Sequence, residues 1–263
     1  MELKDKKLFL LDMDGTIYID DRLFPGVKEF LRSIKDRGGK YIFMTNNSAR
    51  GVSGYIEKLG RLGIEAEAAD FVTSADATVE RLSDRKQGKL YVMGTESLKD
   101  QLRQWGFDIA EEADEDVETV LCGFDRELTY KKLEDVCRLL SHGDRGYFAT
   151  NPDWVCPAEF GYVPDCGSMC SMIERATGRL PEFIGKPQPA MALLAMERTG
   201  FSAEETLVVG DRLYTDIACG INAGVDTCFV LSGEGTEKDI ETTGVKPTYV
   251  LKDIAELHRR TES

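Results

Sequence analysis

A short apolar segment that ends on carboxylates constrains the fold of this 263-residue chain more than any other feature. Residues 8–11 read Leu-Phe-Leu-Leu, and Asp12-Met13-Asp14-Gly15-Thr16 follows directly. A strand with one solvent-exposed face alternates apolar and polar residues, whereas a strand of a parallel sheet is covered on both faces and is continuously apolar. The segment therefore predicts a buried parallel strand with acidic residues at its carboxyl end.

A helix and a second apolar strand follow within about 40 residues. Pro25 stands at the favoured first position of a helix, and apolar residues recur at the spacing of one helical face until Gly38. Residues 41–44, Tyr-Ile-Phe-Met, form the next apolar run and again stop on polar residues. This order predicts a right-handed βαβ unit.

The same alternation returns near the C-terminus. Apolar runs end at Gly185, Gly210 and Leu231, and the helical patterns between them end at Gly200 and Gly224. Asp253 is placed as the cap of a last helix. These segments predict further strands and helices of the same parallel sheet.

The middle of the chain has a different pattern. Apolar runs at 90–93, 117–122 and 147–149 alternate with helical spacing over 131–140. We therefore expect an α/β protein whose Rossmann-like core, residues 1–80 and 182–263, contains an inserted smaller α/β domain, residues 81–181.

Polar residues directly after the apolar runs are the candidates for chemistry, because ligands bind outside the carboxyl ends of parallel strands. They are Asp12 with Asp14, Thr45 with Asn46, Lys186, and Asp211. Three carboxylates, a hydroxyl, an amide and an ammonium at one edge suit the handling of a phosphoryl group.

The acidic residues also indicate a metal. Asp12 and Asp14 point the same way if the backbone there is extended, and two such close carboxyls need a cation between them or one retained proton. Oxygen ligands from Asp12 and Asp211 suit Mg²⁺. We expect Asp216 either to hold a metal-bound water or to orient Lys186.

Four segments together resemble the motifs of the haloacid dehalogenase superfamily. In chain order they are Asp12-Met13-Asp14-Gly15-Thr16, Met44-Thr45-Asn46-Asn47-Ser48, Gly185-Lys186-Pro187 and Gly210-Asp211-Arg212-Leu213-Tyr214-Thr215-Asp216. An insertion between the second and third motifs, containing Asn151-Pro152-Asp153, resembles the cap of the NagD/4-nitrophenylphosphatase branch. The resemblance covers almost the whole chain.

The resemblance implies roles for the acidic residues. Asp12 would be the nucleophile that forms an aspartyl-phosphate, and Asp14 would protonate the leaving oxygen and then deprotonate the attacking water. Mg²⁺ would be held by the Asp12 carboxylate, the Asp14 backbone carbonyl and Asp211. A carboxyl two residues beyond the nucleophile favours a phosphatase over a dehalogenase, because a halide needs no proton on leaving.

The resemblance also implies a phosphate site and a substrate-recognition segment. Thr45, Asn46 and Lys186 would bind the phosphate, and Asn47 would orient the substrate or the cap. Residues 151–167, rich in Gly and Pro, are either a specificity loop or a structural hairpin of the cap. Within that segment the candidates for substrate contact are Asn151, Asp153 and Trp154, although Trp154 can equally be a packing residue.

Composition limits the partners and the compartment. With 33 Lys and Arg against 47 Asp and Glu, the net charge of −14 argues against nucleic acid or an anionic membrane as the main partner. No apolar run approaches the roughly 18 residues of a membrane helix, and the N-terminus lacks the apolar core of a signal peptide. An odd number of cysteines, seven, indicates reduced thiols. We expect a cytoplasmic protein.

The leading hypothesis is a Mg²⁺-dependent phosphomonoesterase of small cytosolic esters such as sugar phosphates, nucleotides or 4-nitrophenyl phosphate. One alternative is a phosphotransferase or mutase that shares the covalent intermediate, although only one helix separates the first two motifs, where mutases tend to carry their cap. The other is a non-catalytic sensor of phosphorylated metabolites. Cap-mediated dimers occur in the branch, so a homodimer is a further expectation.

Overall fold

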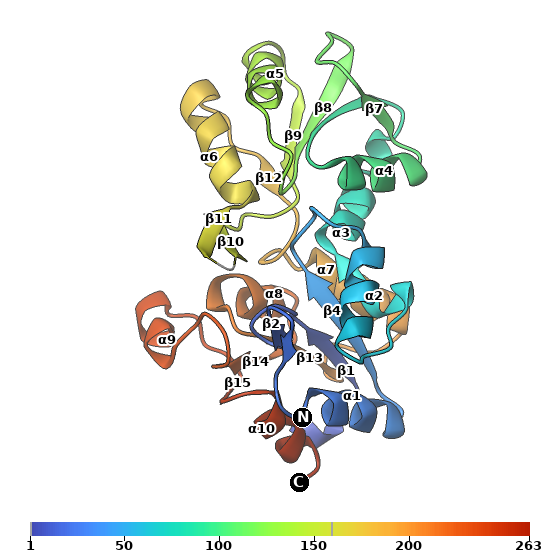
Figure 1. The fold of residues 1–263 in the computed structure, drawn as a ribbon, viewed down its shortest axis with the longest axis vertical. Helices are drawn as coiled ribbons and strands as arrows, with labels where there is room; N and C mark the ends of the chain where they lie inside the picture. The colour runs from blue at the N-terminus through green and yellow to red at the C-terminus, as the bar shows by residue number, and fades with distance from the viewer. Residues whose placement is uncertain (1, 159) are drawn as a thin grey trace. The chain divides into compact units, whose positions relative to one another are not determined.

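The computed structural model describes residues 2–158 and 160–263, which divide into two compact units. The first contains residues up to 45, 52–72 and 186–263, and the second contains 46–51 and 73–185. The predicted inserted domain, 81–181, falls entirely within the second unit. Figure 1 shows the elements of both.

A six-stranded sheet forms the centre of the first unit, in the order β15-β14-β13-β1-β4-β5. Its strands are β1 (Leu8–Leu11), β4 (Lys40–Thr45), β5 (Phe71–Thr73), β13 (Thr206–Gly210), β14 (Asp226–Val230) and β15 (Tyr249–Leu251). The pairs from β4 through β1, β13 and β14 to β15 are all parallel. All four residues of β1 are fully buried, which explains why no polar residue interrupts the run.

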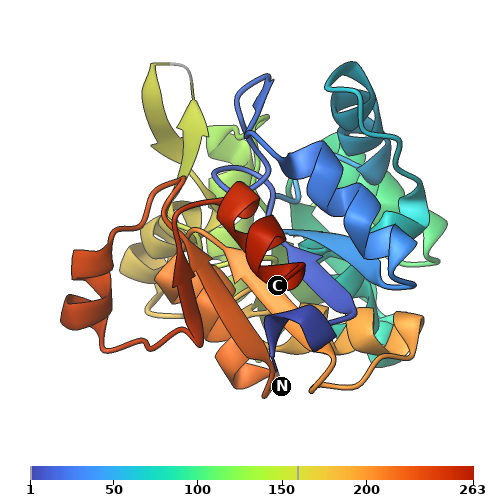
Figure 2. The same ribbon diagram turned by 90° about the horizontal axis from the view of Figure 1, so that it is seen from below.

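Helices cover both faces of this sheet. Figure 2 shows α10 (Ile254–Thr261, red) and α1 (Val27–Asp36, blue) on one side, and α7 (Ala190–Thr199) and α8 (Ala218–Asn222), both orange, on the other. The apolar stripe of α1 is buried, and Phe30 meets Phe9 of β1 edge to face at 5.2 Å between ring centres. This packing is the amphipathic helix that the periodicity predicts.

The remaining elements of the first unit are short. They are η1 (Leu3–Asp5), the hairpin of β2 (Tyr18–Ile19) and β3 (Arg22–Leu23), α2 (Val52–Arg61), η2 (Ala68–Asp70), the π turn η4 (Leu213–Ile217) and α9 (Glu237–Thr243).

The second unit has its own parallel sheet, in the order β12-β9-β8-β6-β7. Its strands are β6 (Lys89–Met93), β7 (Asp108–Ala110), β8 (Val117–Cys122), β9 (Gly146–Ala149) and β12 (Glu182–Phe183). Its helices are α3 (Ser74–Arg81), η3 (Ser83–Arg85), α4 (Glu96–Gln104), α5 (Tyr130–Ser141) and α6 (Cys166–Thr177), and β10 (Val155–Ala158) pairs with β11 (Gly161–Pro164) in an antiparallel hairpin. None of the helices in the described part of the chain combines the length and apolar character needed to cross a bilayer.

The α/β fold expected from the sequence is confirmed, with one correction to its connectivity. The sequence pattern places the apolar run before Lys186 in the core sheet, but β12 pairs with β9 in the sheet of the second unit. Two strand residues are too few to reveal which sheet they join. Lys186 therefore follows a strand of the other sheet and not one of the core.

Candidate active site

The register of the central strands brings the first and last motifs together. Leu11, the last residue of β1, is paired with Val209 on one side and Phe43 on the other. Asp12 therefore stands level with the residues that lead into Asp211 and into Thr45, so that polar groups from three strand ends meet at one edge of the sheet.

Lys186 is a buried cation held by two carboxylates. Its Nζ lies 2.6 Å from Asp12 Oδ1, 2.6 Å from Asp216 Oδ1 and 3.3 Å from the carbonyl oxygen of Met44, and the residue is only 2% exposed. Burial alone would lower the pKa of the lysine, but the charges of Asp12 and Asp216 outweigh it and raise the pKa. The ammonium is therefore a permanent positive charge against Asp12.

Asp211 is fixed by backbone and hydroxyl donors. Its Oδ2 accepts from the backbone nitrogen of Glu234 at 2.7 Å, and its Oδ1 accepts from Thr16 Oγ1 at 3.3 Å. Two glycines make room for the carboxylate, since a Cβ on Gly15 would lie 2.4 Å from Oδ2 and one on Gly233 would lie 2.0 Å from it. Only residues without side chains can approach the carboxylate this closely.

The site has the donors and the charge imbalance of a divalent-cation site. Asp12, Asp211 and Asp216 each place a carboxylate oxygen within 4.8 Å of the others. Burial and the charge of Asp216 raise the pKa of Asp12, and the same two causes raise that of Asp211 to about 6. A cation would relieve this repulsion, and oxygen donors are those that Mg²⁺ prefers. Both oxygens of Asp216 accept hydrogen bonds, from Lys186 and from the backbone nitrogen of Arg212, and both oxygens of Asp211 are likewise engaged. Asp12 and Asp211 as the ligands of the metal stay a prediction.

The backbone around Asp216 is a π turn. The nitrogens of Asp216 and Ile217 both donate to the carbonyl oxygen of Arg212, at 3.1 and 3.2 Å. Such wide turns occur often at functional sites. The turn places the Asp216 carboxylate 2.6 Å from the Lys186 ammonium. Whether Asp216 orients Lys186 or holds a metal-bound water stays a prediction.

Asp14 occupies the open side of the site. Its side chain is 51% exposed, and it accepts a hydrogen bond from the Tyr18 hydroxyl at 3.3 Å. The Lys58 ammonium lies 3.6 Å from its other oxygen. A half-exposed carboxyl is able to exchange protons with a leaving group or with water, whereas the less exposed Asp12 carboxylate, 16% exposed and paired with the Lys186 ammonium, suits attack on an electrophile.

The residues predicted to bind phosphate divide between the two units. Thr45 is buried at the end of β4 in the first unit. Asn46 is grouped with the second unit, where its side-chain nitrogen donates to Asp153 Oδ2 at 2.7 Å. Asn47 also belongs to the second unit and accepts from the backbone nitrogen of Ala49. Their roles stay predictions.

The predicted specificity residues lie in two environments. Asn151 is fully buried and donates to Asp153 at 2.8 Å and to Asp165 at 3.0 Å, and Asp153 is itself buried. Trp154, the next residue, is 59% exposed. The two polar side chains thus belong to an internal hydrogen-bond network, and the indole is the group that remains accessible to a ligand.

Sequence reasoning missed Tyr18 and Lys58 as neighbours of Asp14. Tyr18 belongs to a two-residue strand, and Lys58 lies on a helix that no motif includes. The only available signal was their proximity in sequence to the first and second motifs, which does not specify direction.

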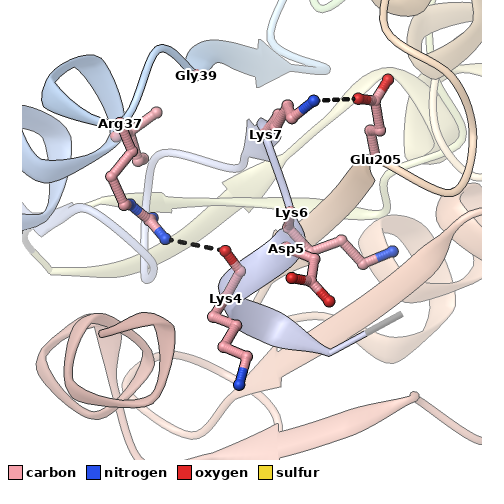
Figure 3. Close-up of a pocket in the computed structure, with 8 residues that line it drawn as sticks. Lys4, Asp5, Lys6, Lys7, Arg37, Gly39 and Glu205 are labelled. Carbon is pink, nitrogen blue, oxygen red and sulfur yellow. Dashed lines mark hydrogen bonds and ion pairs between the residues drawn. The ribbon is translucent and has the colours of Figure 1, made fainter. Parts of the chain in front are cut away.

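A pocket of about 410 Å³ lies elsewhere in the first unit and is unrelated to these residues (Figure 3). Together with residues of η1 and α1, its lining includes three residues that directly precede strands, Lys7 before β1, Gly39 before β4 and Glu205 before β13. These are the amino ends of the strands, opposite to the edge with Asp12. Its basic groups are engaged, since Lys7 pairs with Glu205 at 2.7 Å and Lys6 with Asp226 at 2.6 Å.

Known families and proteins match the chain closely. A family model described as haloacid dehalogenase-like hydrolase matches residues 9–108, and a second, HAD-hydrolase-like model matches residues 183–257. The acid sugar phosphatase of Staphylococcus aureus strain MRSA252 is 36% identical over 255 residues, covering 97% of this chain and 97% of that protein.

Solved structures agree with these matches. The 4-nitrophenylphosphatase of Thermotoga maritima superposes with a TM-score of 0.92 at 41% identity, covering 98% of both chains. NagD from Escherichia coli K-12 gives 0.86 at 32% identity, covering 95% of this chain and 97% of that one. A glycerol phosphate phosphatase from Mycobacterium tuberculosis, solved in complex with magnesium, gives 0.92 at 28% identity, covering 100% of this chain and 79% of that one.

Proposed function

The chain belongs to the haloacid dehalogenase-like hydrolases and is a phosphatase, and on that premise we propose that it is a Mg²⁺-dependent phosphomonoesterase that acts through an aspartyl-phosphate. The observation that carries the proposal is the buried Lys186 ammonium, 2.6 Å from both Asp12 and Asp216, beside the carboxylate of Asp211. A fixed cation against a single reactive carboxylate suits the transfer of an anionic group.

In the first step, Asp12 is the nucleophile. One of its carboxylate oxygens forms a bond to phosphorus while the bond from phosphorus to the ester oxygen breaks. The ester oxygen keeps the bonding electrons and takes the proton of Asp14, so that it leaves as an alcohol. Lys186 offsets the negative charge that would otherwise oppose the approach of a phosphate to a carboxylate.

In the second step, water releases the phosphate. Asp14, now ionised, accepts a proton from a water molecule whose oxygen bonds to phosphorus. The bond between phosphorus and Asp12 breaks, the carboxylate is restored, and inorganic phosphate departs. The exposure of Asp14 supports this double role, because it can reach both the leaving group and the solvent.

The metal ion would be held by the carboxylates of Asp12 and Asp211 and by the backbone carbonyl of Asp14. When bound, Mg²⁺ supplies positive charge that stabilises the phosphoryl oxygens in the transition state. The magnesium complex of the related glycerol phosphate phosphatase supports the choice of ion.

We further propose small phosphate esters as substrates, sugar phosphates and 4-nitrophenyl phosphate among them. The related acid sugar phosphatase and 4-nitrophenylphosphatase carry those substrates in their names. Selection among esters is assigned to the inserted domain, residues 81–181, with the exposed Trp154 as its candidate contact. Thr45, Asn46 and Lys186 are assigned to the phosphate and Asn47 to orientation of the substrate.

Cytoplasmic location and a homodimer also belong to the proposal. The seven cysteines are free thiols, and five of them are buried, which suits a reducing compartment. Sedimentation at equilibrium would report the mass of the assembly.

A phosphate-release screen tests the function. Purified protein is incubated with a panel of sugar phosphates, nucleotides and 4-nitrophenyl phosphate, with Mg²⁺ or with chelator, and with or without acceptor sugars. We expect inorganic phosphate from several esters, loss of release in chelator and recovery on addition of Mg²⁺. Transfer to acceptors in place of release would establish a phosphotransferase, and tight binding without turnover would establish a sensor.

A further inference from the structure

Lys58 and Tyr18 form a small cluster with Asp14 that the proposed mechanism does not yet use. Tyr18 Oη donates to Asp14 Oδ2 at 3.3 Å, and Lys58 Nζ lies 3.6 Å from Asp14 Oδ1. The Lys58 ammonium also stands 3.6 Å from the centre of the Tyr18 ring. Each member of the cluster thus contacts the other two.

The tyrosine ring fixes the position of the lysine. Tyr18 is fully buried in the core of the first unit, so its ring cannot move without disturbing that core. The Lys58 side chain is only 14% exposed, and an ammonium over an aromatic face is attracted to it, more strongly when partly desolvated. Among the described residues, Asp14 is the one carboxylate within 4 Å of this ammonium.

Asp14 needs such support. Its side chain is half-exposed and lies in a tight turn after β1, closed by a hydrogen bond of 2.8 Å from the Gly15 nitrogen to the Tyr18 carbonyl oxygen. This backbone hydrogen bond fixes the main chain of the turn but not the rotation of the carboxyl group. A hydroxyl at one oxygen and an ammonium at the other restrict its rotation.

We propose that Lys58 and Tyr18 are positioning residues that hold the Asp14 carboxyl against the leaving oxygen of the substrate. The inference rests on the proposed function, in which Asp14 gives its proton to that oxygen. It assigns catalytic importance to a lysine of α2 that lies outside the four motifs.

The positioning of Asp14 by Lys58 and Tyr18 can be detected by comparing substrates with different leaving groups. An alkoxide must take up a proton as its bond to phosphorus breaks, so hydrolysis of an alkyl phosphate depends on a well-placed acid. The 4-nitrophenolate ion is stable without that proton, so formation of the phospho-enzyme from its ester depends little on Asp14, whereas the second step is the same for both esters. Loss of positioning therefore slows the first step far more for the alkyl ester than for the aryl ester.

The test compares Lys58→Met with wild type on an alkyl phosphate and on 4-nitrophenyl phosphate, by the single-turnover rate of leaving-group release, which reports the first step alone, and by KM. Methionine keeps an apolar stem of similar length over the Tyr18 ring and removes the charge. We expect the single-turnover rate of leaving-group release to fall at least tenfold for the alkyl ester and less than threefold for the aryl ester, with KM changed less than threefold for both. Tyr18→Phe should show the same selectivity in weaker form, and Lys58→Arg should recover most of the loss.

Two further variants make the result specific. Lys35→Met is the matched control, because the Lys35 ammonium also stands over a tyrosine ring, 4.9 Å from the centre of Tyr41, with no part in the site. It should leave both substrates unchanged. In an Asp14→Asn background, Lys58→Met should have no additional effect on the alkyl ester, since its partner is gone.

Each other outcome overturns the inference. An equal loss of the single-turnover release rate on both esters would indicate a structural role, and a raised KM with an unchanged release rate would make Lys58 a substrate-binding residue. An additive loss in the Asp14→Asn background would separate Lys58 from Asp14. Failure of Asp14→Asn itself to discriminate between the esters would instead overturn the acid role in the proposed function.

Discussion

Lys186 illustrates how a single residue defines this site. A buried ammonium is unfavourable unless it is paired, and here two carboxylates at 2.6 Å compensate for its desolvation. The same pairing keeps Asp12 oriented and its charge partly neutralised. Among the described residues no hydrogen-bond donor reaches the other oxygen of Asp12, which leaves that atom accessible for bond formation.

At the residue scale, the raised pKa of Asp211 predicts a pH-dependent response to Mg²⁺. Its folded-state pKa of about 6 exceeds the ordinary value of 3.8, because burial and the charge of Asp216 disfavour ionisation. Without metal, the folded state binds a proton more tightly than the unfolded state, so this group's contribution to stability falls as pH rises from about 4 to about 6. Mg²⁺ replaces that proton and should restore the loss.

We therefore expect Mg²⁺ to raise the melting temperature clearly at pH 7.5 and much less at pH 5, where the proton competes with the ion. Thermal unfolding with and without Mg²⁺ at the two pH values measures this. Asp211→Asn is the control and should abolish the shift at both. A larger Mg²⁺ effect at pH 5 than at pH 7.5 would contradict the assignment of Asp211 as a ligand.

At the element scale, the turn after β1 is the piece that assembles the site. The strand ends at Leu11, and within four residues the chain supplies Asp12, Asp14 and the close approach of Gly15 to Asp211. Gly15 has φ of +92°, a conformation that side chains disfavour, and its missing Cβ leaves room for a carboxylate. The turn is therefore shaped by backbone geometry as much as by its acidic side chains.

We expect Gly15→Ala to impair metal binding and not only stability. The new Cβ would lie 2.4 Å from Asp211 Oδ2 and would push the carboxylate away. We expect the Mg²⁺ concentration for half-maximal activity to rise at least tenfold. Gly38→Ala is the matched control, because Gly38 has φ of +73° with no atom within 4 Å of its Cβ position. That variant should lose a similar amount of stability, about 1 kcal/mol, and keep the wild-type Mg²⁺ dependence. An unchanged Mg²⁺ dependence in Gly15→Ala would contradict the claim that the Asp211 carboxylate needs a residue without a side chain at position 15.

At the scale of the whole molecule, a strongly acidic protein handles anionic esters. The net charge of −14 repels a phosphate at long range, but salt screens that repulsion beyond about 10 Å. Within the site, the fixed charge of Lys186 and a bound divalent ion dominate. Phosphatase chemistry therefore depends on local charge, and the overall charge affects mainly the rate of encounter.

The sequence predicts much of this molecule because its strands are buried on both faces. The uninterrupted apolar runs of β1, β4 and β13 and the single apolar face of α1 follow directly from burial, and each appears within one or two residues of its expected place. Asp253 caps α10 as expected, accepting from the nitrogen of Glu256.

Features that depend on tertiary contacts could not be predicted. The two-residue β12 chooses its sheet by pairing with β9, and the π turn around Asp216 arises from one extra residue between donor and acceptor. Lys58 belongs to none of the four motifs, and only the fold shows that its ammonium lies over the Tyr18 ring. Site residues within motifs are visible in sequence, whereas residues that position them are not.

Trapping the covalent intermediate tests the central claim most directly. The protein is mixed with substrate and Mg²⁺, quenched in acid within one turnover and treated with borohydride, which reduces an aspartyl-phosphate to homoserine. Peptide mass spectrometry should find homoserine at position 12 alone, and neither Asp12→Asn nor protein without substrate should yield it. Turnover with no modified residue, or homoserine at another aspartate, would contradict the account.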